Sequence, residues 1–224
     1  MNPLLIRRRG MIAKEAVLPD GQLEWIETDG VAYIDTNVAG GQPKSVKVTA
    51  QITNGLASFC LIGAYYGSST MTRRFVFSRY VAGEMKIHAY FHSSGDISVS
   101  CANSILNNTP FDIETKLNRN KQEISIKEQG EEWVSEVGTN SSNSNGTATI
   151  LIFAAHGDNN SIIWNAPRGT RLMSTKIYND ITFSTLLRDY LPWRLNGVVG
   201  LWDNLSQTFF APQVGTLTGG PNVI

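Results

Sequence analysis

The sequence predicts an all-β protein, and three observations support this fold class. From Leu23 onward apolar residues recur at every second position, as in a strand that buries one face. Residues that favour turns separate the apolar runs at short intervals. No stretch of the sequence keeps helical spacing over three turns. Many short strands between turns indicate a sandwich or a barrel, and 224 residues can bury one large core.

The first twenty residues lack this periodicity and end in the turn sequence Pro19-Asp20-Gly21. We expect an extended arm over residues 1–20 and one sandwich domain over residues 21–224. The apolar patch of the arm precedes its arginines, the reverse of a secretory signal peptide, so we expect no such signal. The patch can anchor the arm while the cations bind carboxylates on another protein, although a solvated charge run is the common alternative. The predicted partner-docking residues are Leu4, Leu5, Ile6, Arg7, Arg8 and Arg9.

The predicted strands follow in chain order. Lys44–Thr53 places Val46, Val48, Ala50 and Ile52 on one face and polar residues on the other, which predicts a half-buried strand. A nearly continuous apolar run indicates that the next strand is more central. The further predicted strands are Leu56–Tyr65, Arg73–Tyr80, Glu84–Phe91, Ile97–Ala102, Phe111–Leu117, Gln122–Lys127, Thr147–Ala154 and Arg171–Tyr178.

The C-terminal part of the chain carries the densest strand and turn signals. Leu187–Arg194 and Val198–Asp203 are predicted strands joined by a tight reversal at Asn196-Gly197. A second turn leads to a third strand at Thr208–Phe210, and glycines end the segment. Phe183–Arg188 is the only place where we expect a short helical turn.

Several motifs resemble one family of domains. They comprise an opening segment, a short strand motif and a closing segment, and together they span about residues 23–220. They are Leu23–Thr36, Lys176-Ile177-Tyr178, Arg188-Asp189-Tyr190-Leu191-Pro192, Gly200-Leu201-Trp202-Asp203, Phe209-Phe210 and Gly215-Thr216-Leu217-Thr218-Gly219. The chain resembles the concanavalin A-like, or laminin-G-like, jelly-roll domains of phage and prophage structural proteins from gut bacteria. Trp193 departs from the pattern, because relatives often carry a small residue or Cys there.

The resemblance implies a concanavalin A-like jelly-roll β-sandwich with an extended N-terminal arm. It also implies a non-enzymatic virion protein, a head or tail fibre or decoration protein, whose arm binds other virion proteins. A trimer or dimer and attachment to host surface glycans are further expectations, and the protein would be assembled in the host cytoplasm. The alternative is a bacterial cell-surface carbohydrate-binding protein, which would need an export signal.

Aromatic side chains and histidines are the candidate glycan contacts, because sugars stack on aromatic faces. Inward-pointing Ile87 and Ala89 predict that the residues between and beyond them face outward. Trp25, Trp193 and Trp202 are instead expected to pack in the core. The predicted carbohydrate-binding residues are Tyr65, Tyr66, His88, Tyr90, His92 and Trp164.

Asp112 and Glu114 are the closest match to the paired carboxylates of jelly-roll glycosidases, because residues two apart on a strand share a face. The longer acidic motif of the glucanase branch is absent from the sequence. We expect both side chains to face solvent beside the turn at residues 118–121. The chain is therefore predicted not to be an enzyme.

No metal or other cofactor is predicted. His88 and His92 would stand about 13 Å apart on a strand, too far to share an ion. The resemblance implies a calcium ion near the loop that contains His156 and Asp158, and an Asx-rich turn is the simpler interpretation. Cys60 and Cys101 are expected to be buried thiols, and a disulfide between them stays open.

The balance of charge argues against nucleic acid as a partner. The chain has 19 basic and 19 acidic residues, so the positive field that attracts phosphates is absent overall. No apolar run of the sequence approaches the 18 or so residues that would span a membrane. We therefore expect neither nucleic acid nor a membrane as partner.

Overall fold

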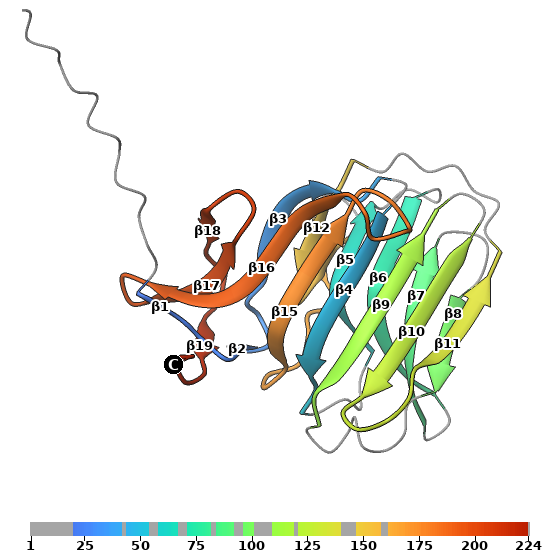
Figure 1. Cartoon of the computed structure of the whole chain (residues 1–224), viewed down its shortest axis with the longest axis horizontal. Coiled ribbons are helices and arrows are strands. Elements are labelled where there is room, and N and C mark those ends of the chain that lie inside the picture. The colour runs from blue at the N-terminus through green and yellow to red at the C-terminus, as the bar shows by residue number, and fades with distance from the viewer. Residues whose placement is uncertain are drawn as a thin grey trace, which may run out of the picture.

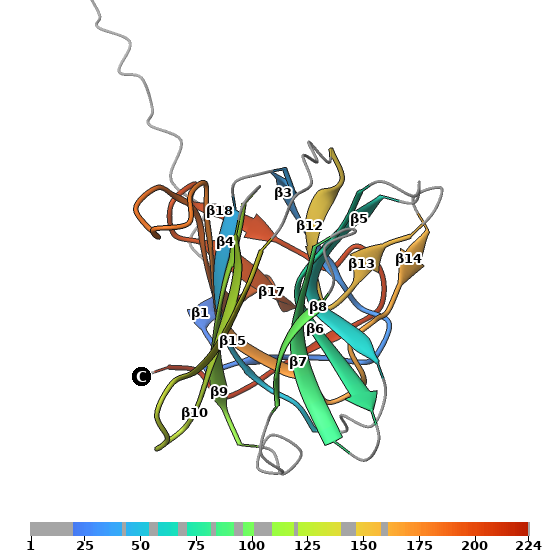
Figure 2. The ribbon, with the colours of Figure 1, turned by 90° about the vertical axis from the view of Figure 1, so that its right-hand side faces the viewer.

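Two antiparallel sheets stacked face to face form the body of the protein (Figures 1 and 2). The computed structural model describes residues 20–41, 44–53, 58–66, 71–81, 84–91, 96–100, 109–118, 121–139, 147–157 and 161–223. This part of the chain contains strands and turns and no helix, so it has no helix that could cross a bilayer. The architecture is the predicted all-β jelly-roll sandwich.

The large sheet follows the order β11-β10-β9-β4-β15-β16-β17-β18, with β1, β2 and β19 attached beside β15 and β16. Its strands come from distant parts of the sequence, so the order is set by tertiary pairing. Their bounds are β1 (Gly21–Gln22), β2 (Ile26–Thr28), β4 (Lys44–Gln51), β9 (Phe111–Leu117), β10 (Gln122–Glu128), β11 (Val134–Gly138), β15 (Arg171–Tyr178), β16 (Leu186–Leu195), β17 (Val198–Asp203), β18 (Thr208–Phe210) and β19 (Leu217–Gly219).

The small sheet follows the order β3-β12-β5-β6-β7-β8 and covers the inner face of the large sheet (Figure 2). A two-stranded ribbon, β13-β14, lies beside β5. Their bounds are β3 (Ile34–Ala39), β5 (Phe59–Tyr66), β6 (Met71–Val81), β7 (Glu84–Phe91), β8 (Asp96–Ser100), β12 (Thr149–Ile152), β13 (Ala155–His156) and β14 (Ile162–Ile163).

The core lies between the two sheets and follows the predicted alternation. In β4, Val46, Val48 and Ala50 are buried, whereas Lys47 and Thr49 are partly exposed on the outer face. The same alternation runs through β9, where every second residue from Phe111 to Leu117 is buried. Because β4 pairs with β9 and with β15, the latter through one register shift, the inward side chains form mostly apolar rows that also contain the buried Thr115 and Thr175.

One buried hydroxyl connects the two sheets. Tyr190 on β16 is fully buried, and its hydroxyl donates a hydrogen bond of 3.0 Å to the carbonyl oxygen of Thr36 on β3. Burial raises the pKa of Tyr190 well above its ordinary value, so the group stays a donor. The Tyr190 ring also packs edge-on against Phe210, with ring centroids 5.2 Å apart.

The closing segment confirms the predicted strands and turns. β16 and β17 are joined at Asn196-Gly197, where both residues have positive φ, at 51° and 77°. This is the geometry of a type I′ turn, which favours Asn-Gly because few other residues adopt these dihedrals. The predicted strand at Thr147–Ala154 is shorter, because Phe153 also has positive φ and the chain then turns into β13.

The predicted helical turn at Phe183–Arg188 is wrong. Residues before Leu186 form a loop organised by Asp180, whose carboxylate accepts hydrogen bonds from the backbone N–H groups of Thr182, Ser184 and Thr185. Desolvation opposes these bonds and the bond from the Thr182 hydroxyl, but together the bonds hold the pKa of Asp180 far below its ordinary value. A side chain that satisfies the backbone locally competes with a helix.

The expectation that Trp25, Trp193 and Trp202 are core residues is also wrong. All three are half-buried. Trp193 and Trp202 lie on adjacent strands of the large sheet, with ring centroids 6.2 Å apart in an edge-on arrangement. Trp25 stacks under the guanidinium of Arg171, 4.0 Å from the ring centroid. A large indole can lie half-buried on the face of a sheet as readily as it fills a core, and the sequence motif does not distinguish these positions.

Candidate functional site

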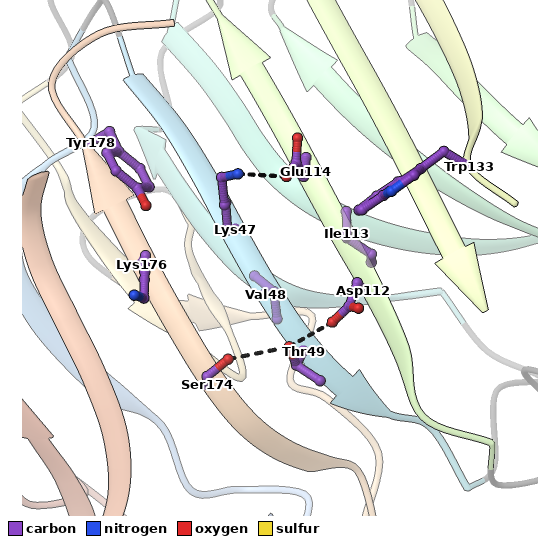
Figure 3. Close-up of a pocket in the computed structure, with 10 residues that line it drawn as sticks. All are labelled: Lys47, Val48, Thr49, Asp112, Ile113, Glu114, Trp133, Ser174, Lys176 and Tyr178. Carbon is purple, nitrogen blue, oxygen red and sulfur yellow. Dashed lines mark hydrogen bonds and ion pairs between the residues drawn. The ribbon is translucent and has the colours of Figure 1, made fainter. Parts of the chain in front are cut away.

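A hollow of about 360 Å³ lies on the outer face of the large sheet, over β4, β9 and β15 (Figure 3). Its floor comes from these three strands, and one wall comes from the residue that precedes β11. Most of the side chains around it are polar or charged, and one is an exposed indole. The lining residues are Lys47, Val48, Thr49, Asp112, Ile113, Glu114, Trp133, Ser174, Lys176 and Tyr178.

The strand register brings these polar side chains together. Lys47 of β4 lies opposite Glu114 of β9 and Lys176 of β15. Two residues further along β4, Thr49 lies opposite Asp112 of β9 and Ser174 of β15. Since the neighbouring residues of β4 point into the core, these side chains must point outward. The result is two polar rows that cross the strands at the bottom of the hollow.

Short polar contacts hold the rows in place (Figure 3). Lys47 Nζ lies 2.6 Å from Glu114 Oε1. The hydroxyl of Thr49 donates to Asp112 Oδ1 at 2.6 Å and accepts from the hydroxyl of Ser174 at 3.2 Å. Each of these groups keeps donor or acceptor capacity for a further partner. The hollow therefore presents ammonium, hydroxyl and carboxylate groups in fixed positions.

An exposed aromatic ring flanks the polar rows. Trp133 is 42% exposed, and its indole borders the hollow on the side of β9. On the opposite side the buried Tyr178 packs edge-on against Phe183, with ring centroids 5.2 Å apart. The ammonium group of Lys47 lies 4.1 Å from the centroid of Phe183, which restrains this lysine. Trp133 is thus the lining aromatic residue with a surface available to a ligand.

Asp112 and Glu114 do share the outer face of β9, as predicted. They are not confined to the turn at residues 118–121, because β9 is an inner strand of the sheet and both carboxylates line the hollow. Each is engaged by a neighbour on β4: Asp112 by Thr49 and Glu114 by Lys47. The expected exposure on a bare surface is therefore wrong for Glu114, which is partly buried by this contact.

The predicted glycan residues lie elsewhere. His88 is only 5% exposed, so its predicted position on an open face is wrong. Ile87, His88 and Ala89 are all buried, which means that β7 is covered on both faces at this point. Trp164 is half-buried and packs against Cys60 and Ala155.

Other predicted contacts fall partly or wholly outside the described residues. The backbones of Tyr65, Tyr66 and Tyr90 lie in β5 and β7, but their side chains are outside the described part. His92 and the arm residues Leu4, Leu5, Ile6, Arg7, Arg8 and Arg9 are also outside it.

The residues of the hollow were missed for a physical reason. Alternation marks Lys47 and Thr49 as outward-facing, but it does not reveal that β4 lies between β9 and β15. That arrangement brings together residues more than a hundred positions apart in the sequence. Trp133 had a local signal, since an isolated Trp between Glu132 and Val134 does not fit a buried stripe.

No metal centre is apparent in the described part of the chain, where no three His, Cys, Asp or Glu side chains come together. The calcium ion that the resemblance implies would lie near a loop whose residues 158–160 are outside that part. His156 before this loop bonds to Thr149, 3.2 Å from Nε2 to the hydroxyl, and Thr149 donates to Asp35. Burial lowers the pKa of His156 more than the charge of Asp35 raises it. Cys60 is buried as predicted, whereas Cys101 lies outside the described residues.

Comparison with known proteins gives matches in structure alone. No family model matches the sequence, and the search of curated proteins found no match. A heptameric SAP-like pentraxin from Limulus polyphemus superposes with a TM-score of 0.57 at 8% identity, covering 88% of this chain and 94% of the pentraxin. A Bacteroides ovatus protein assigned to carbohydrate binding gives 0.55 at 10% identity, covering 91% of this chain and 62% of that protein.

Tailspike protein 2 of an Escherichia coli O157:H7 bacteriophage gives a TM-score of 0.52 at 11% identity, covering 70% of this chain. The chain spans only 25% of the length of the tailspike. At these identities the likeness concerns the fold. The chain has the jelly-roll β-sandwich fold that the lectin-like structures share.

Proposed function

We propose that the protein binds a carbohydrate in the hollow on the outer face of the large sheet. The observation that carries this proposal is the exposed indole of Trp133 beside two fixed polar rows. A pyranose ring has an apolar C–H face and an edge of hydroxyl groups. The face can stack on Trp133, while the hydroxyls exchange hydrogen bonds with Asp112, Thr49 and Ser174.

The charges of the hollow favour a sugar that carries both hydroxyl and acidic groups. Lys176 Nζ lies 3.6 Å from Asp189 Oδ1, a loose contact, and the lysine side chain is 42% exposed. Its ammonium group can reorient toward a ligand carboxylate or sulfate at little cost, because an exposed ion pair contributes little. The hydroxyl groups of the sugar would donate hydrogen bonds to the carboxylates of Asp112 and Glu114, because each carboxylate has two acceptor oxygens.

We place the domain on a phage particle, as a fibre or decoration protein that attaches to host surface glycans. The tailspike similarity over 70% of this chain supports that setting. The alternative setting is a bacterial cell surface, supported by the similarity to the Bacteroides ovatus protein over 91% of this chain. In both settings the domain binds its glycan without cleaving it and without a cofactor.

Glycan binding is tested on an array that carries neutral, carboxylated and sulfated glycans. We expect Trp133→Ala to weaken binding to the preferred glycan at least tenfold, the loss typical of about 1.4 kcal/mol or more. Leu205→Ala is the matched control, because Leu205 is 55% exposed on the turn between β17 and β18, away from the hollow. If the native protein and both variants bind the glycan equally, the hollow is not the binding site.

Hydrolysis is tested with the glycan found on the array. We expect no shortened product on prolonged incubation with the native protein. If product forms and is abolished by Asp112→Asn or Glu114→Gln, the protein is a glycoside hydrolase whose carboxylates are the acid and nucleophile.

A further inference from the structure

The strand β11 is an exposed edge of the large sheet (Figure 1). It ends the strand order and, among the described residues, pairs only with β10. Val134 and Val137 are 55% and 56% exposed, and Trp133 precedes them at 42%. An edge strand with unpaired backbone groups and exposed apolar side chains is a template for another strand.

This edge is strongly acidic. Residues 128–138 contain Glu128, Glu131, Glu132 and Glu136 and no Lys or Arg. Glu131, Glu132 and Glu136 are exposed, and none of them forms an ion pair within the described part of the chain. Because like charges repel, this edge disfavours an acidic strand and favours a basic one.

The N-terminal residues have the complementary pattern. Residues 1–14 contain Arg7, Arg8, Arg9 and Lys14 and no Asp or Glu. An apolar triplet at residues 4–6 precedes the arginines. The triplet matches the exposed valines of β11, and arginine forms paired hydrogen bonds with carboxylates. A short apolar and basic segment is thus a suitable added strand for this edge.

The position of β1 indicates which copy supplies the segment. β1 pairs with β16, and Asp20 just before it accepts a hydrogen bond of 2.9 Å from Gly197 N. From β16 to β11 there are five strand intervals, about 24 Å at the usual spacing. In its own chain the basic segment would have to cross this width over a face where Glu114, Glu123 and Asp189 are already paired with lysines, so these carboxylates offer its arginines no free partner on the way. A second copy placed end to end avoids that crossing.

We propose that residues 4–9 of one copy add as a strand to β11 of the next copy. The arginines of the segment pair with Glu131, Glu132 and Glu136, and its apolar residues cover Val134 and Val137. The docking edge and the hollow share Trp133 at their border, but Glu131, Glu132 and Glu136 do not line the hollow, so variants at these three residues test the assembly without changing the glycan site.

The test is a charge exchange between two full-length variants. The first carries Arg7→Glu, Arg8→Glu and Arg9→Glu; the second carries Glu131→Lys, Glu132→Lys and Glu136→Lys. We expect light scattering to find the native protein as an oligomer of its 24.6 kDa chain and each variant alone as a monomer. Mixing the two variants restores the oligomer, because each basic group then meets an acidic one.

Two control variants test whether the loss of the oligomer is specific to the charges of β11. Leu205→Lys adds a positive charge far from β11 and leaves the oligomer intact. Glu131→Gln, Glu132→Gln and Glu136→Gln together remove the charges without reversing them, and we expect self-association at least about tenfold weaker. Thermal unfolding verifies that each variant is folded.

A native protein that is monomeric at all concentrations overturns the proposal. The proposal is also overturned if either charge-reversal variant, the triple Arg→Glu or the triple Glu→Lys, remains an oligomer on its own. A cysteine pair at Leu5→Cys and Val137→Cys, with Cys101→Ser, adds the final distinction. We expect a disulfide between chains, and a disulfide within one chain would place the segment on its own edge and overturn the proposal.

Discussion

At the residue scale, buried or half-buried carboxylates hold the turns of this protein. Asp29 Oδ1 accepts hydrogen bonds from the backbone N–H groups of Val31 and Ala32, and its Oδ2 accepts one from Thr216 at 2.7 Å. Asp29 therefore ties the opening turn to the closing segment. Desolvation alone would raise the pKa of Asp29, but the hydrogen bonds outweigh it and lower the pKa.

The pH dependence of stability follows from this lowered pKa. The unfolded Asp29 has the ordinary value of 3.8, and the folded value lies below it. Its stabilisation is complete above the unfolded value and is lost as the pH falls through the folded one. We expect Asp29→Ala to lower Tm by several degrees at about pH 7 and by progressively less as the pH falls below the unfolded value and through the folded one. Calorimetry across this range checks the prediction; a pH-independent difference would contradict it.

At the element scale, two glycines of one hairpin have different roles. Gly197 needs positive φ in the turn, and a Cβ there would meet no neighbour within 4 Å. Gly200 lies in regular strand, but a Cβ there would collide with the carbonyl oxygen of Phe210 and lie 2.7 Å from the ring of Phe209. The first glycine is required by its backbone, the second by the close packing of β18.

These roles predict different costs for the same substitution. Gly197→Ala should destabilise the protein by about 1 kcal/mol, the usual cost of a left-handed residue with a side chain. Gly200→Ala should cost more, about 2–3 kcal/mol, because backbone cannot move aside easily. Urea unfolding of both variants measures the difference. Similar costs would mean that β18 is not held closely against β17.

The elements also show which features the sequence could predict. The turn at Asn196-Gly197 and the alternation of Val46 and Val48 are local, so they were predicted correctly. The loop at Asp180 was missed because side-chain hydrogen bonds to the backbone decide it, and these depend on the path of the chain. His88 was predicted to be exposed because alternation shows only that one face of β7 is buried. It does not show that the opposite face is buried at this point as well.

The site was less predictable than the strands. Asp112 and Glu114 were recognised as a pair on one face, but their partners Thr49 and Lys47 come from a strand paired only in the fold. Such pairing reflects long-range packing, which a period of two does not encode.

At the scale of the whole molecule, Tyr190 joins the two sheets through its bond to Thr36. We expect Tyr190→Phe to destabilise the protein by about 1–2 kcal/mol, because the buried carbonyl of Thr36 loses this partner. Tyr33→Phe is the control, since the Tyr33 hydroxyl makes no hydrogen bond to a described residue, and it should cost less than about 0.5 kcal/mol. Denaturant unfolding measures the free energy of unfolding of both variants. If the two substitutions have equal effects, the hydrogen bond from Tyr190 to Thr36 does not stabilise the protein.

β1, which directly follows residues 1–20, pairs with β16 inside the strand order of the large sheet, whereas β11 ends that order five strand intervals away. A contact between the N-terminal segment of one copy and β11 of another joins two different surfaces, and two copies satisfy it around a two-fold axis only when the exchange is reciprocal. Repetition of such a contact gives a closed ring when the rotation per subunit divides a full turn, and otherwise a helical filament. In a ring every hollow faces the same way relative to the axis, so weak glycan contacts would act together as avidity.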